Sequence, residues 1–155
     1  MKNITLRFKF IITCLSLIIF TSIAQSQVIN YQKLKVYTVD GKGTIFNEKH
    51  ETIGKLDIDG NIYNAKDTKI AHIDAYGNIF DNSTDEKYGK VDKNGNLLHV
   101  VKKKVVSWKC FAPENDGTTL CLIKNKEGKV VATVNKLFKE YGPGAIYYFK
   151  QINKK

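Results

Sequence analysis

A repeat of 17 or 18 residues constrains the fold of this chain more than any other feature of its sequence. Glycines recur at spacings of 17, 17 and 18 residues: Gly43, Gly60, Gly77 and Gly95. An aspartate stands three residues before each of them: Asp40, Asp57, Asp74 and Asp92. Aliphatic residues stand four before and two after each glycine, and an aromatic residue follows in three of the four copies. Matched columns of this kind indicate a chain built from copies of one supersecondary unit.

The physical chemistry of a β-hairpin explains each column. Aspartate favours the first position of a type I turn, because its carboxylate accepts a hydrogen bond from a backbone N–H two residues on. A glycine three residues later supplies the positive φ that ends the turn in a bulge. We therefore expect four hairpin tips, with these aliphatic pairs facing each other on one side of the sheet: Val39–Ile45, Leu56–Ile62, Ile73–Ile79 and Val91–Leu97.

One copy of the turn, "GKLDIDGNIYN", also looks like a calcium loop, with Asp57, Asp59 and Asn61 at alternate positions. An EF-hand loop has glycine at its sixth position and glutamate at its twelfth. Here glycine directly follows Asp59, and the twelfth residue from Asp57 is Thr68. The sequence therefore predicts a turn, with no metal and no cofactor.

The predicted strands are too short for one hairpin to bury its face alone, so the copies must share a core. The position six before each glycine is small in three copies (Gly54, Ala71 and Gly89), which indicates close approach of strands near a central axis. Polar segments such as "NEKHET" and "NAKDTK" are expected to form the returning turns. The sequence predicts an all-β fold of repeated hairpins in a radial, closed, flower-like or propeller-like arrangement, completed by C-terminal strands.

The pattern "IGKLDIDGNIYN…IAHIDAYGNIFD…YGKVDKNGNLL" resembles the bacterial β-flower repeat proteins, whose function is not established. The resemblance covers residues 34–104 and implies a secreted protein with four or five β-hairpins arranged radially. The chain departs from the family pattern because the second turn of each repeat lacks glycine, and any fifth unit is irregular. The resemblance implies a fold and carries over no catalytic residue.

Residues 1–24 have the pattern of a signal peptide. A basic start, "MKNITLRFKF", precedes an apolar run that ends at Ile23 and is shorter than the ~20 residues of a spanning helix. Ser22 and Ala24 are spaced as signal peptidase requires, which predicts cleavage after Ala24, or after Ser26 as the alternative. A retained anchor is the other alternative. We expect a secreted or periplasmic protein without a membrane span in the mature chain, with residues 25–33 as a lead-in and 34–155 as one domain.

The net charge of the chain narrows the classes of partner that we expect. Loss of residues 1–24 lowers the formal charge from +10 to +7 and removes the only arginine, Arg7. A basic surface suits an anionic polymer, but the lack of arginine argues against a specific nucleic-acid reader.

Beyond residue 104, "VVSWKCFAPENDGTTLCLI" predicts a hairpin, and "GKVVATVNKLF" and "AIYYFKQI" predict two strands joined at Gly142–Gly144. Residues 134–141 are alternatively one or two helical turns.

Cys110 and Cys121 remain after processing, on either side of a predicted turn, and predict a disulfide in an exported protein. Two buried free thiols are the alternative. The histidines His50, His72 and His99 fall in three different columns, which argues against a histidine cluster. No catalytic residue is predicted, and we expect a protein that is not an enzyme.

The aromatic column is the predicted ligand surface: Phe46, Tyr63 and Phe80, with Lys55. In the hairpin register these rings lie opposite the aliphatic face, beside Thr38, Lys55 and His72. They suit stacking on sugars or holding an acidic polymer; the alternative is that they pack between hairpins. We expect an exported non-catalytic β-repeat domain, a structural or interaction module of the bacterial envelope that binds an envelope polymer or protein. The alternative is a binding protein for an acidic glycan or another cell-surface polymer.

Overall fold

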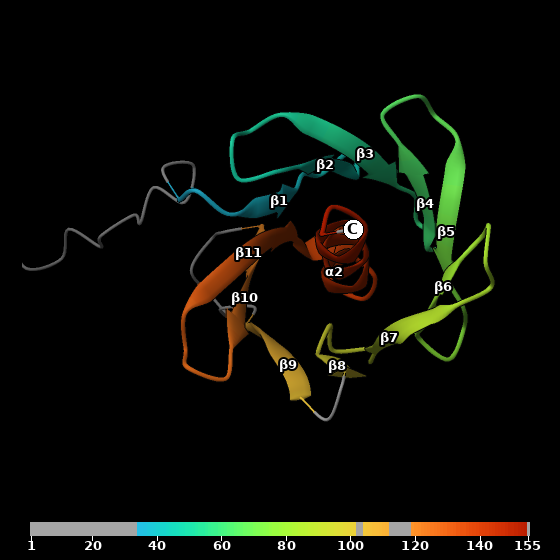
Figure 1. Cartoon of the computed structure of the whole chain (residues 1–155). Helices are drawn as coiled ribbons and strands as arrows, with labels where there is room; N and C mark the ends of the chain where they lie inside the picture. Colours follow the sequence, from blue (N-terminus) through green and yellow to red (C-terminus); the bar gives the residue numbers. More distant parts are fainter. Residues whose placement is uncertain (1–33, 102–103, 112–118, 155) are drawn as a thin grey trace, which may run out of the picture. The chain divides into compact units, whose positions relative to one another are not determined.

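Eleven β-strands form a closed barrel in the described part of the chain, which in this computed structural model is residues 34–101, 104–111 and 119–154 (Figure 1). The predicted signal peptide, the lead-in and the turn "PENDG" lie outside the described residues. The repeats form β1 (Tyr37–Val39), β2 (Thr44–Phe46), β3 (Thr52–Leu56), β4 (Asn61–Asn64), β5 (Lys69–Ile73), β6 (Asn78–Asp81), β7 (Lys87–Val91) and β8 (Leu97–Val101). The last three strands are β9 (Lys104–Phe111), β10 (Leu120–Asn125) and β11 (Val130–Asn135).

Each strand pairs antiparallel with the next along the chain, and a parallel pair between β1 and β11 closes the ring. This confirms the predicted closed, radial, all-β class. The hairpin expected on either side of "PENDG" is also present, as the antiparallel pair of β9 and β10.

The predicted hairpin tips are confirmed. The Asp57 carboxylate accepts hydrogen bonds from the backbone N–H groups of Asp59 (3.0 Å) and Asn61 (2.8 Å). The other three tips, which begin at Asp40, Asp74 and Asp92, repeat this pattern. The closing glycines have φ between 77 and 83°: Gly43, Gly60, Gly77 and Gly95. The four aliphatic pairs face each other in the predicted register.

The returning turns reach the same geometry without glycine. His50, Asp67 and Asp85 take the left-handed conformation, with φ of 62, 57 and 55°. The turn that joins Asp81 to Glu86 is one residue longer than the two earlier returning turns, which explains the spacing of 18 residues before Gly95.

The turn that joins β10 to β11 is of this returning kind. Asn125 stands where an asparagine or aspartate begins each earlier returning turn, and it accepts a hydrogen bond from the Lys129 backbone N–H at 2.9 Å, while Gly128 has φ of 76°. The register shift between Ile123 and Lys124 repeats the shifts beside the other returning turns.

The C-terminal run "AIYYFKQI" is helical, so the prediction of a strand with a turn at Gly142–Gly144 was wrong. Helix α2 (Gly142–Ile152) follows the 3₁₀ turn η2 (Lys136–Phe138), which agrees with the alternative of a helical turn in residues 134–141. Pro143 stands in the first turn of α2, where its fixed φ suits a helix start. All residues from Gly142 to Phe149 are buried, and a helix buried on all sides lacks an amphipathic period.

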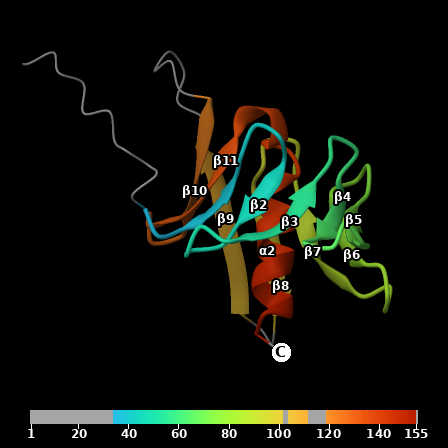
Figure 2. The same ribbon diagram turned by 90° about the horizontal axis from the view of Figure 1, so that it is seen from above.

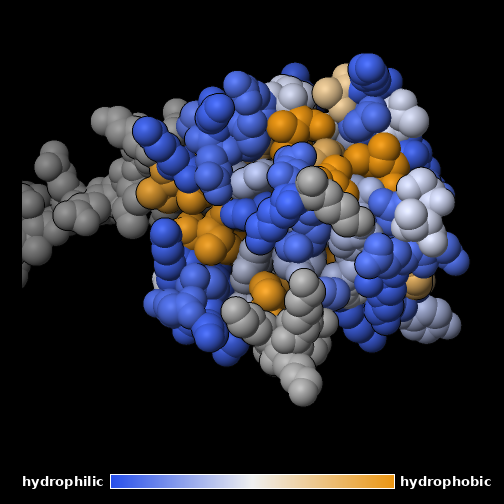
Figure 3. Space-filling view, in the orientation of Figure 1, coloured by the Kyte–Doolittle hydropathy of each residue, from blue (hydrophilic) through white to orange (hydrophobic). Residues whose placement is uncertain are grey.

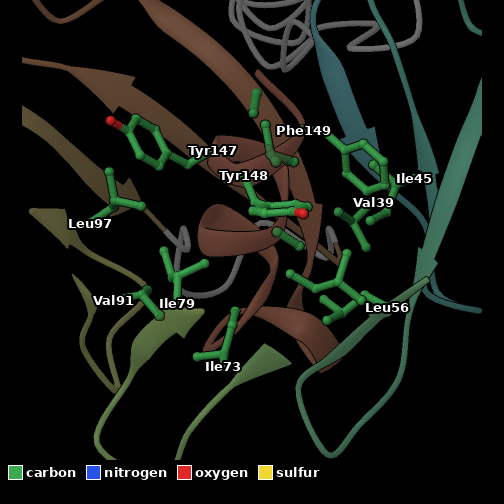
Figure 4. Packing of buried hydrophobic residues seen from close by; sticks show 14 of the residues in the cluster. Val39, Ile45, Leu56, Ile73, Ile79, Val91, Leu97, Tyr147, Tyr148 and Phe149 are labelled. Carbon is green, nitrogen blue, oxygen red and sulfur yellow. The ribbon is translucent and has the colours of Figure 1, made fainter. Parts of the chain in front are cut away.

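Helix α2 occupies the axis of the barrel. It stands inside the ring of strands in Figure 1 and runs lengthwise among them in Figure 2. Tyr147, Tyr148 and Phe149 extend from it towards the aliphatic residues of the surrounding strands (Figure 4). At Gly54, a Cβ would overlap both the Tyr63 carbonyl oxygen of the neighbouring strand β4 and the Phe149 ring of α2, so the small residue admits a close strand and the helix. Among the described residues, no helix is long and apolar enough to cross a membrane.

Candidate functional site

The predicted aromatic column lies on the outer face of the barrel, as expected from the alternation of side chains along a strand. Tyr63 stands opposite Lys55 on β3 and, on its other side, opposite Lys69 on β5. We call Lys55, Tyr63 and Lys69 the tyrosine row. Its two lysines are exposed and its ring is partly exposed, so an aromatic edge lies between two cations.

A second row repeats this arrangement on the next hairpin. Phe80 stands opposite His72 on β5 and Lys87 on β7, and these three residues form the phenylalanine row. The His72 and Phe80 rings are stacked, with centroids 5.5 Å apart and planes at 24°. The first hairpin differs, because Phe46 stands between Thr38 and Thr52. Among the first three hairpins, basic side chains therefore flank the outward-facing ring only on the second and third.

The rings are neither fully buried nor free of the protein. The Tyr63 hydroxyl donates to Asp57 Oδ2 at 3.0 Å, and this hydrogen bond raises the pKa of Tyr63 above its ordinary value. Asp57 thus connects the hairpin tip to the tyrosine row. The sequence left two possibilities, an open ligand surface and rings packed between hairpins. The rings are half-buried, so neither possibility holds fully.

Repeated bulges open a groove beside the tyrosine row. The register shifts by one residue where β4 meets β5, so that Lys69 rather than Ile70 faces Tyr63. The groove has a volume of about 810 Å³ and lies between the second and third hairpins. Ile53 and Ile70 line it together with Phe149 and Ile152 of α2, and Lys66 and Lys69 supply its positive charge. Figure 3 shows hydrophobic surface between hydrophilic side chains at the barrel end near the C-terminus of α2.

A buried carboxylate, Asp81, forms part of the wall of this groove. Tyr148 donates to its Oδ2 atom at 2.7 Å, while the hydroxyl and backbone N–H groups of Ser83 and Thr84 donate to Oδ1. Burial opposes the ionisation of Asp81, but the hydrogen bonds from Ser83, Tyr148 and Thr84 outweigh it and hold its pKa well below the ordinary range. Asp81 is therefore ionised at neutral pH, and its position ties α2 to the third hairpin.

The two predicted disulfide partners are present as neighbouring free thiols. Cys110 pairs with Ile123, two residues along β10 from Cys121, so both side chains share one face. Cys121 is fully buried. The hydrogen bond between the thiols, followed by burial, raises the pKa of Cys110, whereas the same hydrogen bond lowers that of Cys121. The disulfide stays a prediction.

The histidines are scattered, as their columns in the repeat predicted. His50 lies in a returning turn, His72 in the phenylalanine row and His99 against Tyr147 with ring centroids 5.3 Å apart. Within the described ranges, no group of three or more histidine, cysteine or acidic residues could hold a metal ion.

Sequence reasoning missed Lys69 and Lys87 as members of the rows, and it missed the groove. A signal for the two lysines exists, because each directly follows a returning turn and occupies the same column. The groove depends on bulges and on side chains of α2, neither of which the strand interpretation contained.

Comparison with protein-family models, curated proteins and solved structures finds no match for this chain. Its function must therefore be argued from its own residues.

Proposed function

We propose that this chain is an exported, non-catalytic β-repeat domain that serves as an interaction module of the bacterial envelope. The observation that carries the proposal is the recurrence of one outward-facing row, a ring between two basic side chains, on adjacent hairpins. Near-equal copies of a weak contact suit an extended partner, whereas catalysis usually needs one unique constellation. Membership of the β-flower family, the signal peptide and secretion are parts of the same proposal, supported by the radial hairpins and by the pattern of residues 1–24.

A second candidate names the partner as an acidic glycan or another anionic cell-surface polymer. The flanking of Tyr63 by Lys55 and Lys69 favours it, because aromatic rings stack on sugar faces while ammonium groups pair with carboxylates. The adjoining groove shares Lys69 with the tyrosine row, so that one ligand could contact both. Binding would weaken with salt, since exposed charges are screened within about 8 Å at physiological ionic strength.

Binding of the purified protein to immobilised polygalacturonate tests the second candidate. The double variant Lys55→Gln/Lys69→Gln is expected to lose most of the binding. The control, Lys42→Gln/Lys93→Gln, removes the same charge from two exposed hairpin-tip lysines and should retain most of it. Equal losses in the two variants would mean that only net charge matters and would exclude the tyrosine row.

The interaction module is tested more broadly with a panel of immobilised envelope polymers and a Tyr63→Ala/Phe80→Ala variant. A folded variant that has lost binding supports the module. Unchanged binding by that variant would exclude the rings as the contact surface. A measured turnover that is abolished by changing one histidine would overturn the non-catalytic proposal.

A further inference from the structure

A second groove has three lysines among its seven lining residues. It lies on β9 and β10, which stand across the ring from the strands of the tyrosine row, β3, β4 and β5 (Figure 1). It has a volume of about 340 Å³ and lies on the outer face of β9, β10 and the turn after β10. Lys109, Lys124 and Lys126 line it together with Phe111 and Ser107. Among the described residues that line this groove, none is acidic.

Two of these lysines are direct cross-strand neighbours. Lys109 on β9 stands opposite Lys124 on β10. Like charges placed opposite each other on one face of an antiparallel pair destabilise the sheet. An anion bound between the two ammonium groups would replace this repulsion by two attractions, so that binding and stability should change together.

Phe111 helps to fix one of the charges. The Lys124 ammonium lies 4.7 Å from the centroid of the Phe111 ring, a cation–π arrangement. The ring itself is 44 % exposed, so the Lys124 ammonium is held against an accessible surface. A positioned ammonium loses less conformational freedom when a ligand binds.

The ion pair at the edge of this groove is weak. Glu127 Oε1 lies 3.6 Å from Lys126 Nζ, and both side chains are mostly exposed. Exposed ion pairs of this kind contribute little to stability, so a ligand can compete with this pair. Gly128, in the same turn, has no atom within 4 Å of the position that a Cβ would take. The turn side of the groove is therefore open to a ligand.

We propose that this groove binds an oxyanion, a phosphate, sulfate or carboxylate group, between Lys109 and Lys124. The site is separate from the rows and the groove described above and shares no residue with them. The oxyanion is either a free ion or a group carried on an acidic polysaccharide, and the same lysines would hold it in both cases.

Lys109→Gln is the decisive variant, because the two effects of the substitution have opposite signs. Without a ligand at low salt, removal of the repulsion should raise the midpoint of thermal unfolding. Calorimetric titration at fixed ionic strength measures the affinity for inorganic pyrophosphate and for dextran sulfate. The affinity of the variant should be roughly tenfold weaker or more, since hydrogen bonds to charged groups are the strong ones. Lys124→Gln should weaken binding similarly. The control is Lys90→Gln, an exposed lysine on the outer face that stands opposite Leu98 rather than a second lysine.

The outcomes separate the sources of the anion. Lys109-dependent binding of both probes supports a site that accepts free oxyanions. Lys109-dependent binding of dextran sulfate alone supports a site for an oxyanion carried on a polymer. The proposal is overturned if neither probe binds, or if Lys109→Gln binds as the unsubstituted protein does. A result in which Lys90→Gln loses as much affinity as Lys109→Gln would also overturn it, because binding would then follow net charge.

Discussion

Replacing Tyr148 by phenylalanine should lower the free energy of unfolding by about 2 kcal/mol at neutral pH. The Tyr148 hydroxyl donates to Asp81 Oδ2 at 2.7 Å, and both residues are buried. The same hydroxyl also lies 3.2 Å from the Ile70 carbonyl oxygen, which competes with Asp81 for its single proton. A hydrogen bond to a charged group contributes about 1.5–3 kcal/mol. The bonds from Ser83 and Thr84 to Oδ1 remain in the variant, which places the expected loss inside this range.

The loss should depend on pH in a defined direction. Asp81 has a lowered pKa in the folded protein, so its contribution to stability is present above the ordinary carboxyl pKa of about 3.9 and is lost as the pH falls towards the folded value. Without the Tyr148 hydroxyl, the folded pKa of Asp81 rises part of the way towards its ordinary value, because the bonds from Ser83 and Thr84 remain. The difference in stability between the two proteins should therefore stay constant from pH 7 down to the folded pKa of the variant, which lies below about 3.9, and shrink only as the pH falls further.

Urea unfolding at pH 7 and in steps from about pH 4 to about pH 2 measures both effects. Trp108, the single tryptophan, is 7 % exposed inside the barrel and reports unfolding by its fluorescence. The control is Tyr147→Phe, on the next residue of the same helix. The Tyr147 hydroxyl is buried without a hydrogen-bond partner in the described structure, so its removal should be neutral or stabilising by about 1 kcal/mol. Equal stability of Tyr148→Phe and the unsubstituted protein at pH 7, or a difference that grows as the pH falls below about 4, would refute the role given to Asp81.

Two further predictions concern the hairpin tips and the thiols. Gly77→Val should destabilise the protein by more than the ~1–3 kcal/mol of backbone strain, because a Cβ at Gly77 would also overlap the Val91 carbonyl oxygen. The control is Gly128→Val, because Gly128 has a similar φ but open space around it, so that this substitution should show the strain alone. Equal urea midpoints of the two variants would contradict this prediction. If the exported protein carries the disulfide, its mass should be two hydrogens below that of the reduced chain, and reduction should remove roughly 2–4 kcal/mol of stability. Labelling of both Cys110 and Cys121 by iodoacetamide without prior reduction would exclude the crosslink.

The repeats were predictable because their specification is local. Asp57 and Gly60 define a turn within four residues, and the turn sets the cross-strand pairing of Leu56 with Ile62. The predicted outer position of Tyr63 beside Lys55 follows from the same register.

The features that sequence reasoning missed depend on contacts between distant segments. The run "AIYYFKQI" is surrounded by the barrel, and an apolar segment buried on all sides does not distinguish a helix from a strand by its period. The bond from Tyr148 to Asp81 spans 67 positions along the chain, and no local pattern connects them. The groove beside Lys69 needs both the bulge at Ile70 and the side chains of α2, so it could not be predicted before the helix was placed.

The position of α2 also sets an order for the assembly of the protein. The aliphatic faces of the early hairpins pack on residues 142–152, which are synthesised after every strand of the barrel. The parallel pair of β1 with β11 likewise joins the first and last strands of the barrel. A nascent chain that ends before residue 142 therefore exposes the apolar sides of its hairpins and cannot close the ring on a filled core. Closure of the barrel therefore waits until α2 has been made and has a high contact order, and a stop codon at residue 142 should leave a chain prone to aggregation and proteolysis.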